Sequence, residues 1–75
     1  MESVKKYSYE NLIKEILNKK IRFVSDCELF PNFDVKGKPT NYYIKNNELI
    51  FKFTTISGKT IDIGTNMKNL RFEFI

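Results

Sequence analysis

Few side chains in this sequence could do acid–base or metal chemistry, because histidine is absent and Cys27 is the single cysteine. An imidazole is the usual base that activates a thiol, so we expect Cys27 to be a small half-buried side chain and not a nucleophile. No cluster of cysteines or carboxylates has the spacing of a metal site. The sequence therefore predicts a protein that is not an enzyme and that uses no metal and no cofactor.

Three acids occur close together, at Asp26, Glu28 and Asp34. Aspartates in loops commonly accept hydrogen bonds from nearby backbone amides. One interpretation is therefore that these acids stabilise a turn. The other interpretation is a weak cation site or an acidic rim for a basic partner. The three glycines are too far apart to form a phosphate-binding loop. This part of the sequence does not indicate catalysis either.

Lysines and two tyrosines gather between positions 36 and 45. Tyr42 and Tyr43 are adjacent, so on a strand they point to opposite faces, and we expect one in the core and the other exposed. An exposed tyrosine flanked by lysines can stack on a base while the lysines neutralise phosphates. The other interpretation is an ordinary solvated strand face. The predicted nucleic-acid-binding residues are Lys36, Lys38, Tyr43, Lys45, Arg22 and Arg71.

A second candidate surface contains Phe30, Phe33 and Asp34, with Pro31 between the two aromatic residues. In a loop, these phenylalanines either plug the end of a barrel or form an exposed anchor. Aromatic anchors with polar surroundings are typical hot spots of protein interfaces. This alternative predicts a protein-binding module or inhibitor, encoded by a phage or other mobile element, that occupies the surface of a host protein.

Apolar residues alternate with polar ones in five short runs, which predicts five β-strands that share one apolar face. Asn46-Asn47 and Ser57-Gly58 separate neighbouring runs and are typical of tight hairpin turns, because asparagine and glycine tolerate positive φ. The predicted strands are 21–25, 40–44, 49–54, 60–64 and 70–74.

A helix is predicted over about residues 8–19, before the first strand. Ser8 is a good N-cap residue, and apolar residues from Tyr9 to Leu17 recur at intervals of three and four. A helix of this length is not stable alone, so its apolar stripe must dock on the sheet. Between residues 26 and 38 the alternation stops, which predicts a long loop of a kind that is often functional.

The order of these elements resembles the SH3-like barrel and, within that class, the pattern of KOW-type domains. The matching segments are 20–23, then 32–38 with its glycine, and the turn 66–69. The sequence departs from the KOW pattern at Pro39, where that family continues into a regular strand. The resemblance covers about residues 20–75. It implies an α+β, mostly β fold with a five-stranded antiparallel SH3-like barrel, or strongly curled sheet, behind the N-terminal helix.

The length of 75 residues is enough for one domain, residues 1–75. A net charge of +4 favours approach to phosphate or to an acidic protein surface. One cysteine, no apolar signal segment and no apolar run of about 20 residues predict a cytoplasmic protein without a membrane partner. A terminal strand at a sheet edge can pair with its own copy, so residues 71–75 predict a homodimer.

Overall fold

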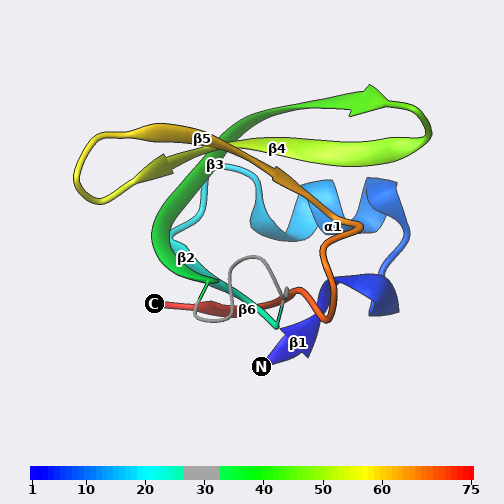
Figure 1. Ribbon diagram of the computed structural model, residues 1–75, viewed down its shortest axis with the longest axis horizontal. Helices are drawn as coiled ribbons and strands as arrows, with labels where there is room; N and C mark the ends of the chain where they lie inside the picture. Colours follow the sequence, from blue (N-terminus) through cyan, green and yellow to red (C-terminus); the bar gives the residue numbers. More distant parts are fainter. Residues whose placement is uncertain (27–32) are drawn as a thin grey trace.

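The computed structural model describes residues 1–26 and 33–75 and shows a mostly β architecture with one α-helix in this part of the chain (Figure 1). The predicted α+β, mostly β class is therefore confirmed. The helix α1 spans Tyr9–Ile16 and follows a 3₁₀ turn, η1, at Val4–Lys6. The strands are β1 (Glu2–Ser3), β2 (Ile21–Ser25), β3 (Phe33–Lys45), β4 (Glu48–Thr55), β5 (Thr60–Gly64) and β6 (Arg71–Phe74).

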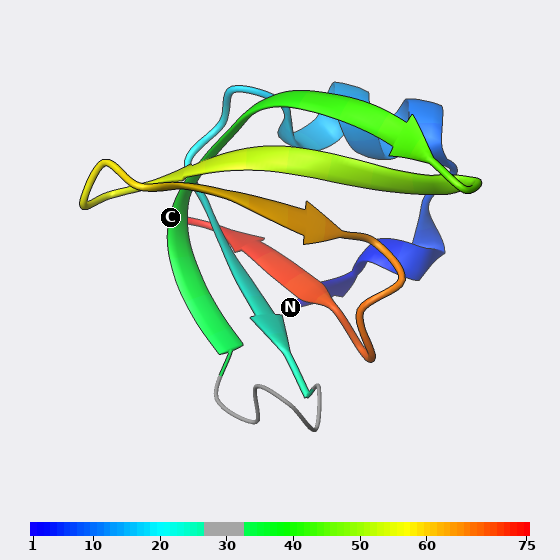
Figure 2. The ribbon, with the colours of Figure 1, turned by 45° about the horizontal axis from the view of Figure 1, so that its top comes forward.

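The strands form one antiparallel sheet of six strands in the order β1-β6-β2-β3-β4-β5. Five of them correspond to the predicted strands, and β1 was not predicted because two residues are too few to show an alternation. The sheet curls around the core but is not closed. Figure 2 shows β6 and β2 in one half of the curl and β4 and β5 in the other.

Strand β3 produces the curl because it belongs to both halves of the sheet. Its first part pairs with β2 and its second part with β4, and Gly37 is paired with both neighbours. A register shift between Pro39 and Asn41 marks a bulge, a feature that bends a strand. A Cβ atom at Gly37 would lie only 2.8 Å from the Cα atom of Thr55. Glycine is therefore the residue that lets β4 pass this close to the bend.

The predicted loop over 26–38 is wrong in its second half, because residues 33–38 are part of β3. Gly37 and Pro39 are unfavourable in a regular strand, which made this segment look irregular in the sequence. Here the glycine lies at the bend and the proline at the bulge, where both residue types are tolerated. Residues 27–32, including Cys27 and Phe30, lie outside the described residues.

Helix α1 begins as predicted, because the hydroxyl of Ser8 accepts a hydrogen bond from the backbone N–H of Asn11 at 3.2 Å. It ends at Ile16, three residues earlier than predicted. Asn18 has a positive φ of 63°, which ends the helix, and its backbone N–H donates to the carbonyl of Pro39 at 2.7 Å. The turn after α1 therefore also holds the start of β2 against the bend of β3.

Phenylalanines form the centre of the core. The ring centroid of Phe23 lies 5.4 Å from that of Phe53 and 6.3 Å from that of Phe51. Helix α1 contributes Leu12 and Ile16, both fully buried, so the predicted docking of the helix stripe on the sheet is confirmed. Within residues 1–26 and 33–75, no helix has the length and apolar character that crossing a membrane requires.

Candidate functional site

Arg22, one of the predicted binding residues, is held by two carboxylates on the outer face of the sheet. Its Nε and Nη2 donate to Oδ1 and Oδ2 of Asp34 at 2.8 and 2.6 Å, and its Nη1 donates to Oε1 of Glu73 at 2.9 Å. The hydrogen bonds from the guanidinium hold the pKa of Asp34 below its usual value. Arg22 thus links β2 to β3 on one side and to β6 on the other.

Arg71 is also paired within the chain. Its Nη2 donates to Oδ1 of Asp26 at 2.9 Å, and the side-chain amide of Asn69 donates to the other oxygen of the same carboxylate at 2.6 Å. The Nε of Arg71 donates to the backbone carbonyl of Asn69 at 3.2 Å. Both arginines of the sequence therefore already have bidentate or multiple partners, which leaves fewer donors for phosphate or guanine.

Three lysines lie close together without such partners, and we call Lys20, Lys36 and Lys38 the lysine cluster. Lys36 and Lys38 are exposed at alternate positions of β3 and share one face. The pairing of Ile21 with Gly37 places Lys20 beside Lys38 across the β2–β3 ladder. Within the described residues, no carboxylate lies within ion-pair distance of any of the three, although the charge of Lys36 contributes to the lowered pKa of Asp34.

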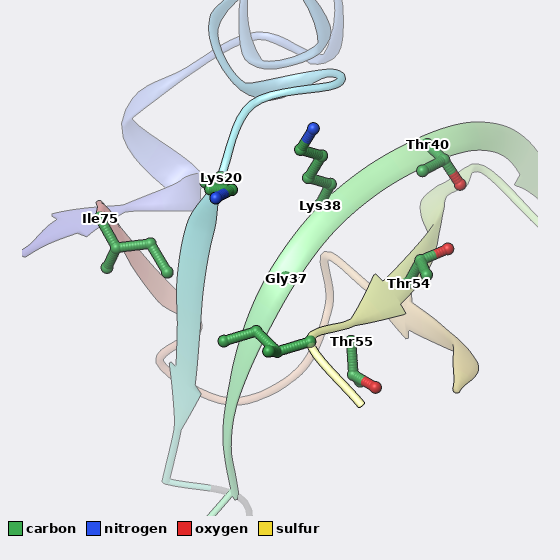
Figure 3. Close-up of a pocket in the computed structure, with 8 residues that line it drawn as sticks. Lys20, Gly37, Lys38, Thr40, Thr54, Thr55 and Ile75 are labelled. Atoms are coloured by element: carbon green, nitrogen blue, oxygen red, sulfur yellow. The ribbon is translucent and has the colours of Figure 1, made fainter. Parts of the chain in front are cut away.

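A groove of about 550 Å³ opens beside the lysine cluster. Figure 3 shows Lys20 and Ile75 on one side of it and threonines of β3 and β4 on the other, with Gly37 between them. Ile56 and Ile75 supply apolar surface and are 74% and 54% exposed. No Asp or Glu side chain is among the described residues that line it. We call it the basic groove, and its charge and apolar surface suit an anion that carries an apolar group.

Tyr43 and Lys45 lie beyond the bulge in β3, opposite Ile50 and Glu48 of β4. The hydroxyl of Tyr43 donates to Oδ2 of Asp62 at 2.8 Å, and this hydrogen bond raises the pKa of Tyr43. The predicted lysine and tyrosine face is therefore divided. Lys36 and Lys38 lie beside the basic groove, whereas Tyr43 contacts Asp62 and Lys45 lies opposite Glu48.

The expectation that one of the two adjacent tyrosines is buried is wrong. Tyr42 is 41% exposed and Tyr43 is half-buried. Tyr42 shares the inner face with Phe51, but β2 accompanies only the first part of β3, so no strand of the described chain pairs beside Tyr42 on that side. On this open edge the backbone N–H of Tyr42 donates to the side-chain oxygen of Asn41 at 2.8 Å.

The second predicted surface is described only in part. Phe33 is half-buried against the core, Asp34 is engaged by Arg22, and Phe30 lies outside the described residues. Phe33 lines a second groove of about 490 Å³, together with Tyr43. The other described residues that line this second groove are Glu48, Ile50, Ile61, Asp62, Gly64 and Met67.

The C-terminal strand, predicted to pair with its own copy, is an interior strand for part of its length. Phe72 pairs with Glu2 of β1 on one side and with Phe23 of β2 on the other. The free edges among the described strands are those of β1, β5, the second part of β3 and the end of β6, where Glu73 and Phe74 have no partner on the β1 side. The physical basis for pairing through β6 is thus reduced, and a homodimer stays a prediction.

Lys20 and Ile56 belong to the basic groove but were not predicted from the sequence. Lys20 lies two residues before Arg22, so the alternation could have placed both on one strand face. Ile56 lies in a turn, and only the approach of the β4–β5 turn to β3 brings it to the groove. In the described part of the chain no group of acids or cysteines could hold a metal ion.

Comparison of the chain with protein-family models, with curated proteins and with solved structures finds no match.

Proposed function

We propose that this protein is a small non-enzymatic binding domain that binds nucleic acid through the lysine cluster at the basic groove. The observation that carries this proposal is that Lys20 and Lys38 line the basic groove, with Lys36 two residues away on the same strand face, and that no carboxylate of the described residues lies within ion-pair distance of them, whereas both arginines are paired. Uncompensated lysines attract phosphates and release the counterions bound to them. The affinity is therefore mainly electrostatic and tolerant of sequence, since lysines act as point charges.

The proposal includes the SH3-like barrel as the fold. Strands β2 to β5 follow one another as a meander, and β6 returns to pair with β2. This order and the strong bend of β3 at Gly37 support the resemblance to that class. Another class of small barrel, the OB-fold, binds single strands on an exposed strand face, which shows that a curled sheet of this size can present such a surface.

The proposal is tested by fluorescence anisotropy with a labelled oligothymidine of about 12 nucleotides and a labelled duplex, between about 50 and 200 mM salt. Each lysine that neutralises a phosphate contributes roughly 0.7 to the slope of log affinity against log salt for a single strand. We expect the variant with Lys20, Lys36 and Lys38 changed to alanine to lose roughly 2 from that slope.

The control variant carries alanine at Lys5, Lys14 and Lys68, which removes the same charge from other parts of the surface. It should keep most of the affinity if the lysine cluster is the interface. Equal losses in the two variants would mean that net charge alone drives the binding. No binding at the lowest salt concentration would refute the proposal.

A second candidate function is the binding of a host protein, as a module or inhibitor from a mobile element. The observation that favours it is the second groove, where Phe33 and other apolar side chains adjoin the acidic residues Glu48 and Asp62. Such a groove suits a partner with apolar and basic side chains. Loss of binding to a pulled-down partner on Phe33→Ala, but not on lysine substitution, would favour this function over the first.

A further inference from the structure

We infer that the ligand of the basic groove is single-stranded nucleic acid, with an unstacked base against Ile56 and Ile75 and the adjacent phosphates on Lys20 and Lys38. This inference rests on the proposed function. It adds to that function the form of the nucleic acid and a subsite for a base.

The groove combines the two features that a nucleotide in a single strand presents. Its volume of about 550 Å³ is that of a small-molecule pocket, and its apolar surface comes from two isoleucines that are more than half exposed. Lysines line the same groove, and Asp and Glu side chains are absent from its described lining. A base within a duplex is stacked and paired and cannot enter such a groove, whereas a base in a single strand is free to do so.

Both isoleucines are fixed to the lysine cluster through the backbone. The N–H of Ile56 donates to the carbonyl of Lys36 at 3.0 Å, and the N–H of Ile75 donates to the carbonyl of Lys20 at 3.2 Å. These hydrogen bonds place the backbone of each isoleucine next to the backbone of a lysine. The groove therefore offers apolar surface and positive charge side by side, which suits a ligand that carries an apolar group next to an anion, as a base lies next to its phosphates.

The test compares an oligothymidine with an abasic strand of the same length, which has the same phosphates but no bases. Stacking of a base on an aromatic side chain is worth roughly 1–3 kcal/mol when measured by alanine substitution, or about 5- to 150-fold in affinity. Aliphatic surface is a weaker platform than an aromatic ring, so we expect the abasic strand to bind about 5- to 10-fold more weakly. The salt dependence should be the same for both strands.

Ile56→Ala is the variant that tests the subsite, since this side chain is 74% exposed and contributes little to the core. It should weaken the binding of oligothymidine about fivefold and leave the abasic strand unchanged. Ile44→Ala is the matched control, because Ile44 is 59% exposed and lies on the second part of β3, outside the residues that line the groove. It should leave the affinity for both strands unchanged.

Equal affinity for the two strands, with no effect of Ile56→Ala, would overturn the base subsite while the phosphate-binding function stands. Failure to bind either strand would overturn both proposals together. Binding of an acidic peptide with alternating glutamate and leucine, sensitive to Ile56→Ala, in a protein that binds neither strand would assign the groove to a protein partner and overturn the inference.

Discussion

Two glycines, Gly37 and Gly64, have no positive φ. Of these two, Gly37 is the one whose replacement by alanine should destabilise the protein more. The new Cβ would lie 2.8 Å from the Cα atom of Thr55 and closer still to the carbonyl oxygen of Thr54. Both are backbone atoms of β4. Gly37 is also paired with Ile21 of β2 on its other side, so β3 cannot move away from β4 without losing that pairing.

The size of the effect follows from two opposing contributions. Overpacking costs about 1–3 kcal/mol, and a clash with backbone that cannot relax is expected at the upper end of that range. Alanine also restricts the unfolded chain, which restores roughly 0.4–1 kcal/mol. The net loss is therefore about 2 kcal/mol. For a domain of this size, such a loss lowers the melting temperature by roughly 8–16 °C.

Thermal unfolding followed by circular dichroism measures this shift, with Gly64→Ala as the matched control. At Gly64 a Cβ atom would meet the carboxylate of Glu48, the end of a flexible side chain. That carboxylate can swing away and lose only its hydrogen bond from the N–H of Asn66, at a cost of about 1 kcal/mol. Equal melting temperatures for the two variants, or a Gly37→Ala protein within two or three degrees of the wild type, would refute the reasoning about the bend.

Two further predictions concern the helix cap and one carboxylate. Ser8→Ala removes the acceptor for the N–H of Asn11 and should cost about 1 kcal/mol, seen as a drop of roughly 4–8 °C in melting temperature; an unchanged melting temperature would argue against the cap. The pKa of Asp34 is lowered in the folded state by Arg22, so its contribution to stability is present above its usual value of 3.8 and is lost as the pH falls through the lowered value. Asp34→Asn should therefore flatten the fall in stability below about pH 4 in denaturant unfolding, and a variant with the same acid profile as the wild type would contradict this.

The apolar face of the sheet could be predicted closely from the sequence. Alternation with period two indicates an apolar face made of Ile21, Phe23, Leu49, Phe51, Phe53, Leu70, Phe72 and Phe74, and all of these are buried except Phe74, which is 50% exposed. This succeeded because side-chain direction on a strand depends only on the position along the strand.

The second half of the predicted loop illustrates where local reasoning failed. Gly37 and Pro39 reduce the intrinsic preference for a strand, but tertiary structure overrides it. The bend requires a residue without a Cβ, and the bulge accepts a proline. The open edge beside Tyr42 has the same origin, because the point at which β2 stops pairing with β3 is a property of the sheet and not of either strand.

The sequence by itself determined the absence of histidine chemistry, the period of the strands and the surplus of lysine over arginine. Only the tertiary structure decided which positive charges are neutralised. Arg22 meets Glu73, 51 residues later in the chain, because β2 lies between β3 and β6. Lys20 and Lys38 become neighbours through the same register and meet no carboxylate among the described residues. Ion pairing depends on distances of a few ångströms, and those distances follow from strand register over long separations, which a local pattern does not contain.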